Sequence, residues 1–107
     1  MDIDPNKAIE YIVLNAPKYA EAKANRVFIE NNLRVVKAKL MNEEEGTLGA
    51  KEAAAYAHMD YEVQLQGLKA AVEQEEKLRY LLEAAKLRIE VWRTNQFSAR
   101  AELKALG

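Results

Sequence analysis

The stretch that decides the fold runs from residue 68 to residue 106 and reads LKAAVEQEEKLRYLLEAAKLRIEVWRTNQFSARAELKAL. It contains neither Gly nor Pro, and its apolar residues return in alternating steps of three and four. That spacing is typical of a long helix that packs along another helix. The positions in this spacing, here called the long seam, are apolar except at Glu75 and Gln96. They are Leu68, Ala71, Glu75, Leu78, Leu82, Ala85, Ile89, Trp92, Gln96, Ala99, Leu103 and Leu106.

Four helices are predicted along the chain, at about 5–15, 18–44, 50–58 and 61–104. Asp4 and Pro5 form a helix start, and Pro17 predicts a kink or break near residues 15–17 because it lacks a backbone donor. Gly46 and Thr47 indicate a turn followed by a capped helix. Asp60 is the expected cap of the last helix.

The helix expected at 18–44 carries two apolar stripes. The first, the matching seam, is Tyr19, Ala22, Arg26, Ile29, Leu33, Val36 and Leu40. The second is Ala20, Ala24, Phe28, Asn31, Val35 and Ala38. A helix with two such stripes usually has neighbours on both sides.

These patterns predict an all-α fold, an elongated antiparallel helical hairpin with a kinked N-terminal helix. A helix of about 44 residues is about 66 Å long, several times the radius of a compact domain of this size. Two helices cannot cover two stripes each, so we expect a homo-oligomer, most simply a dimer that forms a helical bundle. The expected oligomer interface comprises Phe28, Val35, Leu82, Ile89 and Trp92.

Arg26 and Glu75 are polar residues at seam positions of the two long helices. Antiparallel alignment brings residue 26 close to the mid-seventies, so we expect the two side chains to pair. A pair of this kind fixes the register of two helices more than it adds stability.

Composition argues against several functional classes. Half of the residues are apolar and 31% are charged, as in folded proteins, and there is no Cys. We find no membrane-spanning run, no secretory signal pattern, no catalytic motif and no metal or cofactor motif. The single His58 is interpreted as a connector residue rather than a pH-sensitive or substrate-contacting one. The acidic runs 43–45 and 73–76 are interpreted as solvated helix ends, with the exception of Glu75, which lies in the seam.

A basic ladder accompanies the long seam: Arg79, Lys86, Arg93 and Arg100 recur every seven residues, or two helical turns. Such a ladder fits either acidic side chains of a partner helix or a row of phosphates. Residues 77–104 hold seven Lys and Arg residues but only three Glu. Because acids are also scarce in the facing segment, some of this positive charge is expected to stay unpaired.

Aromatic residues lie among these cations. Arg88 and Arg93 flank Trp92, and Phe97 follows within a turn of Arg93. Interleaved aromatic and basic side chains are typical of proteins that bind single-stranded nucleic acid. Trp92 occupies a seam position, which favours a core or interface role, whereas Phe97 lies off the seam and is the better candidate for stacking on a base.

Two stretches, residues 50–58 (AKEAAAYAH) and 77–94 (KLRYLLEAAKLRIEVWRT), are similar to small proteins encoded by tailed bacteriophages and prophages. The resemblance covers about a third of the chain and carries over no site residue. It implies the cytoplasm of a bacterial host and an accessory role in DNA metabolism.

The functional prediction is a non-enzymatic accessory protein that binds single- or double-stranded nucleic acid, or a nucleoprotein partner. The predicted contact residues are Arg79, Lys86, Arg88, Arg93, Arg100 and Phe97. The alternative is a scaffold or inhibitor that binds a host or phage protein through its second apolar stripe or the acidic turn at 43–45.

Overall fold

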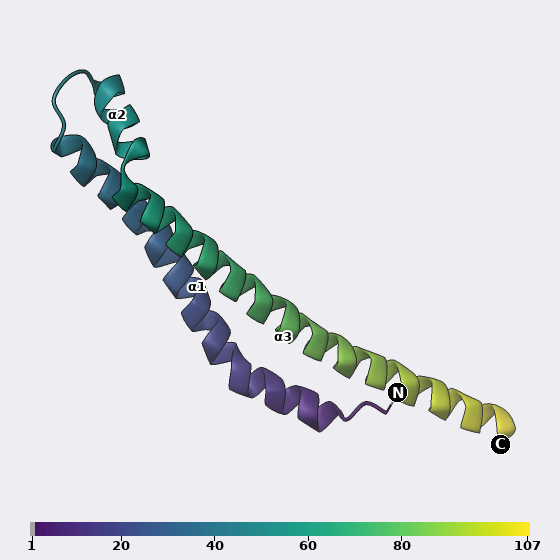
Figure 1. Ribbon diagram of the computed structural model, residues 1–107. Helices are drawn as coiled ribbons and strands as arrows, with labels where there is room; N and C mark the ends of the chain where they lie inside the picture. The colour runs from purple at the N-terminus through teal and green to yellow at the C-terminus, as the bar shows by residue number, and fades with distance from the viewer. Residues whose placement is uncertain (1) are drawn as a thin grey trace. The chain divides into compact units, whose positions relative to one another are not determined.

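A computed structural model describes residues 2–107 of the chain (Figure 1). Helix α1 spans Pro5–Asn42, α2 spans Leu48–Ala57 and α3 spans Met59–Leu106. None of the described residues forms a strand, so the all-α prediction is confirmed.

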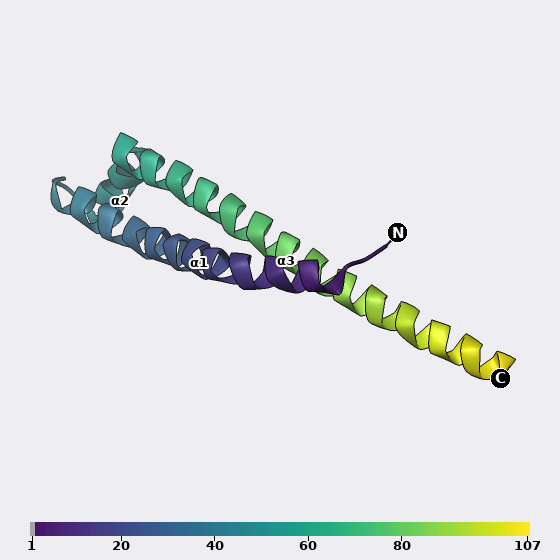
Figure 2. The ribbon, with the colours of Figure 1, turned by 90° about the horizontal axis from the view of Figure 1, so that it is seen from below.

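Helix α1 is continuous, which corrects the expected division into helices at 5–15 and 18–44 (Figure 2). Pro17 lies inside it and cannot donate to the carbonyl group of Val13, its usual partner four residues earlier. Val13 is exposed, so water can satisfy that carbonyl group. One missing bond therefore does not end a helix that packs along its length, and a change of axis at Pro17 stays a prediction.

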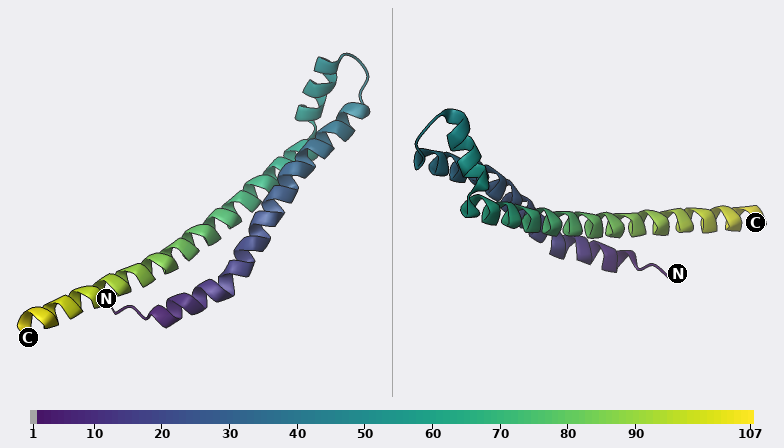
Figure 3. Two further views of the ribbon diagram at one scale, coloured as in Figure 1. Left: turned by 180° about the vertical axis from the view of Figure 1, so that it is seen from behind. Right: turned by 45° about the horizontal axis from the view of Figure 1, so that its top comes forward.

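The expected start of α1 and the turn after it are confirmed. The Asp4 carboxylate accepts from the backbone N–H of Asn6 at 2.9 Å. Thr47 caps α2, because its hydroxyl oxygen accepts from the Ala50 N–H at 3.2 Å. Gly46 has φ of 116°, a conformation that favours glycine. The turn between α1 and α2 can be followed in Figure 3.

The expected cap of α3 is wrong by two residues. His58 ends α2, and its ring nitrogen Nδ1 accepts from the Asp60 N–H at 3.0 Å at the first turn of α3. His58 is thus the connector between two helices, as its interpretation from the sequence proposed.

Helix contacts divide the chain into two compact units, each described by itself. Unit 1 contains the residues before Ala20 together with Lys77–Gly107, and unit 2 is Ala20–Glu76. Both long helices contribute a segment to each unit.

In unit 2 the matching seam of α1 faces the first part of the long seam of α3. Arg26 contacts Glu75, and the Asn32 side chain donates to the Gln64 side chain at 3.3 Å. A lower number in α1 thus meets a higher number in α3, so these segments run antiparallel. The buried residues of this unit are Ala22, Leu40, Ala55, Ala71 and Glu75.

In unit 1 the first turns of α1 lie against α3. Ala8 and Tyr11 share a cavity with Leu81 and Ala85, and Leu82 is buried beside Ile12. The buried apolar residues here are Ala8, Leu78, Leu82 and Ala85. No large described side chain in either unit is completely buried, since a layer of two helices leaves one side open.

The long seam changes character near Arg88. Its members from Ala71 to Ala85 are buried and Ile89 is half-buried, but Trp92 and every later residue are exposed. Helix α1 begins at Pro5, and its first turns share a cavity with the Leu81–Arg88 part of α3, which is where the burial of the seam ends. We call the part that begins at the half-buried Ile89 the terminal seam: Ile89, Trp92, Gln96, Ala99, Leu103 and Leu106.

Candidate nucleic-acid interface

One face of α3 gathers positive charge around an aromatic ring. Steps of seven, four, three and four residues separate its members, so they fall within an arc of about 60° of the helix. This basic face consists of Lys86, Arg93, Phe97, Arg100 and Lys104, all of them exposed.

The cations of the basic ladder differ in their local partners. Arg79 is half-buried, pairs with Glu83 at 3.0 Å and lies over the Tyr80 ring at 4.4 Å. Arg93 contacts Glu90 at 3.4 Å, and both side chains remain more than half exposed. Arg79 is therefore largely engaged within its own helix, whereas exposed pairs like that of Arg93 are weak and can exchange for another anion.

Lys86 and Arg100 form no ion pair with any of residues 2–107, and both are exposed. The expectation that part of the ladder stays unpaired is met at these two positions. Their charges, with that of Arg93, face solvent along two turns on either side of Arg93. This spacing suits a chain of phosphates, which carries one negative charge per nucleotide.

Phe97 lies between Arg93 and Arg100 on the basic face. Its side chain is 74% exposed, an unusual state for so large an apolar ring. It lines a shallow hollow with Arg93, Thr94, Ser98 and Ala101. An exposed ring flanked by guanidinium groups can stack on an unpaired base while the cations hold the backbone.

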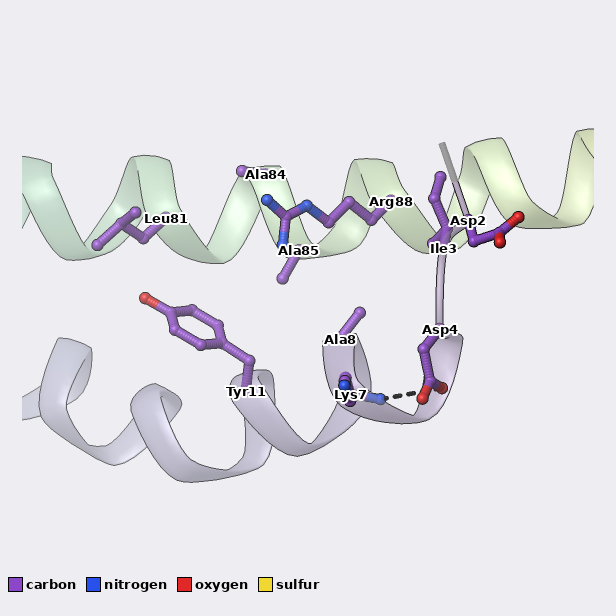
Figure 4. A pocket seen from close by; sticks show the side chains of 10 residues that line it. All are labelled: Asp2, Ile3, Asp4, Lys7, Ala8, Tyr11, Leu81, Ala84, Ala85 and Arg88. Carbon is purple, nitrogen blue, oxygen red and sulfur yellow. Dashed lines mark hydrogen bonds between the residues drawn. The ribbon is translucent and has the colours of Figure 1, made fainter.

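Arg88 lies on the other side of α3, because five residues before Arg93 correspond to about 140° of rotation. It lines a cavity of about 540 Å³ in unit 1, together with Tyr11, Lys7 and the carboxylate-bearing residues Asp2 and Asp4 (Figure 4). Figure 4 shows its side chain lying along α3 over Ala85. The structure thus separates Arg88 from the other predicted contact residues.

The residues predicted to form an oligomer interface are also divided. Phe28 and Val35 are exposed on α1, and Trp92 is 36% exposed on the terminal seam. Ile89 is half-buried. Leu82 is buried within unit 1, so it cannot reach a second copy, and its assignment to the interface is wrong. Its seam position instead packs against α1.

A polar cluster in unit 2 was not predicted from the sequence. Lys37 donates to the Glu52 carboxylate and the Tyr56 hydroxyl, both at 2.7 Å. The hydrogen bond to Glu52 raises the pKa of Lys37, and the same bond lowers the pKa of Glu52. The Tyr56 ring also meets the Tyr61 ring edge to face at 5.2 Å. The only sequence signal was the four-residue spacing of Glu52 and Tyr56; the position of Lys37 depends on how the turn places α2.

Neither a metal-binding cluster nor a membrane span is found in the part of the chain that the structure describes. No three His, Asp or Glu side chains converge between residues 2 and 107. None of the described helices is long and apolar enough to cross a bilayer.

Comparisons with known proteins give no information on function, so the functional argument is based on the residues of this chain. No family model, no curated protein and no solved structure matches this chain.

Proposed function

We propose that this chain is a non-enzymatic accessory protein that binds nucleic acid through the basic face of α3. The observation that carries the proposal is the exposed Phe97 ring between Arg93 and Arg100, with Lys86 and Lys104 along the same line. In this arrangement the cations contact phosphates and the ring stacks on a base.

The local charge of the basic face supports this proposal, whereas the net charge of the whole chain does not. The whole chain has a formal net charge of −1, which would repel a polyanion weakly at long range. Binding therefore depends on local charge, and the basic face provides four cations, Lys86, Arg93, Arg100 and Lys104, within about five turns of one helix. Glu90 lies at its edge and pairs with Arg93, so phosphate must displace one weak contact.

A salt-titrated binding assay with labelled oligonucleotides tests the proposal. For single strands the logarithm of the association constant falls with the logarithm of salt by about 0.7 for each phosphate contacted. The triple variant Lys86→Glu, Arg93→Glu, Arg100→Glu should abolish binding at low salt. The matched control Lys18→Glu, Lys23→Glu, Arg34→Glu makes the same change in net charge at exposed positions of α1. It should retain much more binding than the triple variant of the basic face.

Two results would reject nucleic-acid binding by this face. One is a wild-type protein without affinity for either single or double strands at low salt. The other is equal loss in the two triple variants, since that would reflect net charge rather than the basic face.

The second candidate function is a scaffold or inhibitor that binds another protein through α1. It is favoured by large apolar side chains that stay in solvent on this helix: Val13, Leu14 and Phe28 are each at least 66% exposed. In unit 2, Phe28 and Val35 of the same helix carry the proposed contact between copies of the chain. A protein that ignores oligonucleotides but loses its partner or its oligomeric state on Phe28→Glu would favour this candidate.

A further inference from the structure

Beyond Ile89, the terminal seam is a largely apolar face that the described chain leaves exposed. Trp92 is 36% exposed, Leu103 69% and Leu106 86%. They recur on one side of α3 in steps typical of helix pairing. Large apolar side chains grouped on one side in this way mark a surface that binds another molecule.

The residues that flank the terminal seam limit what that molecule can be. One flank, which we call the basic flank, consists of Lys86, Arg93 and Arg100. The opposite, mixed flank consists of Arg88, Asn95 and Glu102. Flanking positions set partner choice in paired helices, because their side chains meet across the seam.

A second copy of the seam fits these flanks poorly. In an antiparallel pair each flank meets the same flank of its partner, so two basic flanks would oppose each other. In a parallel pair the basic flank meets the mixed flank, which places Arg88 near Arg93 of the other copy. Like charges that face each other across a helix pair are unfavourable, and no arrangement gives the basic flank an acidic neighbour.

We propose that the terminal seam binds an amphipathic helix of a different protein, one whose own apolar seam is flanked by Asp and Glu. The apolar positions of that helix would cover Trp92, Ala99 and Leu103. Its carboxylates would pair with Arg93 and Arg100, both of which are exposed.

This inference does not rest on the proposed function. The terminal seam lies about a quarter turn away from the centre of the basic face, and only Lys86, Arg93 and Arg100 belong to both surfaces. An acidic helix would therefore compete with nucleic acid for these three cations while leaving Phe97 uncovered.

Trp92 gives a direct readout, because it is the single tryptophan of the chain. The probes are two designed helical peptides of about three heptads that lack tryptophan and share one leucine seam. One has Glu at all flanking positions and the other has Lys. The Glu peptide should shift the Trp92 emission to shorter wavelength and bind at least tenfold more tightly than the Lys peptide at low salt.

Paired variants separate the seam from general charge attraction. Leu103→Gln removes a seam contact and should weaken the Glu peptide by about tenfold or more. Val91→Gln replaces an exposed apolar residue on another side of α3 and should leave binding unchanged. Equal binding of the two peptides, no binding of either, or equal effects of the two variants would overturn the proposal.

Two further outcomes would assign the seam to another occupant. If Trp92 emission and sedimentation both change with protein concentration, and Leu103→Gln abolishes both changes, then a second copy covers the seam. If a single-stranded oligonucleotide shifts Trp92 emission and Leu103→Gln prevents the shift, then the seam belongs to nucleic acid. Oligonucleotide binding that is insensitive to Leu103→Gln leaves the proposed function intact whatever the peptides do.

Discussion

Arg26 holds the buried carboxylate of Glu75 at two points, with Nε donating to Oε2 at 2.6 Å and Nη2 donating to Oε1 at 3.1 Å. Arg26 also donates to Glu30 at 2.9 Å on its own helix. The hydrogen bond to Glu75 is the main reason that the pKa of Arg26 rises above its usual value. One guanidinium group thus fixes the register of two helix segments in unit 2.

Removal of the two hydrogen bonds between Arg26 and Glu75 should destabilise unit 2. Arg26→Met takes two charge-assisted hydrogen bonds from Glu75, a residue that is only 6% exposed, and should lower the free energy of unfolding because the buried carboxylate loses its partner. Arg26→Met combined with Glu75→Leu should restore or exceed the original stability, because a well-packed apolar pair has no desolvation cost. Urea unfolding of both single variants and the double variant measures the coupling. Additive effects would contradict a direct interaction between the two residues.

Pro17 should be a site where stability can be gained. Pro17→Ala restores the N–H that can donate to the Val13 carbonyl within continuous α1, so we expect an increase of about 1–3 kcal/mol in the free energy of unfolding. Lys18→Ala, a neighbouring exposed substitution, should change it by less than about 0.5 kcal/mol. Chemical denaturation compares the two. A destabilised Pro17→Ala protein would show that the helix needs the proline.

The contact between α1 and α2 should weaken in acid. The Lys37 hydrogen bond lowers the pKa of Glu52, so the stabilisation is present above the pKa of an unfolded glutamate, roughly 4.3. It is lost as the pH falls through the lower folded-state pKa, because protonated Glu52 no longer attracts Lys37. The protection of α2 amides against hydrogen exchange, measured relative to unstructured peptide at the same pH, should therefore decrease as the pH falls through the folded-state pKa of Glu52.

The variant Glu52→Gln provides the control for this pH effect. Its α2 amides should exchange faster at neutral pH and lose the acid dependence. If the exchange of α2 amides in Glu52→Gln depends on acidic pH as it does in the wild type, the effect belongs to other carboxylates.

Phe97 should distinguish single strands from duplexes. Phe97→Ala removes the ring that stacks on a base, which should cost about 1–3 kcal/mol of binding to single-stranded oligonucleotides. Duplex affinity should hardly change, because paired bases are not available for stacking. Fluorescence anisotropy with both substrates measures the difference. Leu87→Ala, an exposed apolar residue off the basic face, serves as the control, and an equal effect on the two substrates would argue against stacking.

Phe28 should determine whether copies of the chain associate through α1. Phe28→Glu places a charge at an exposed apolar position, so a homo-oligomer held by the second stripe should dissociate without loss of helix content. Sedimentation velocity gives the oligomeric state, and circular dichroism checks the fold. A wild-type protein that is monomeric at micromolar concentration would reject this contact.

The periodicity of the sequence determined the helices and the two seams, because apolar spacing sets which side of a helix avoids water. It also led from two polar seam residues to the Arg26–Glu75 pair. The same one-dimensional pattern could not reveal that Pro17 is tolerated, since continuity there depends on packing along the whole of α1. Nor could it place Lys37 beside α2, because the turn decides where that helix lies.

The sequence alone thus fixed which residues share a helical face, including the cations that accompany Phe97. Only the tertiary structure decided which of those faces are covered. Helix α1 begins at Pro5, and its first turns share a cavity with Leu81, Ala85 and Arg88 of α3. One continuous seam of α3 is therefore buried from Ala71 to Ala85, half-buried at Ile89 and exposed from Trp92 onward. The physical reason is that burial depends on the length of the neighbouring helix, which the pattern of α3 does not contain.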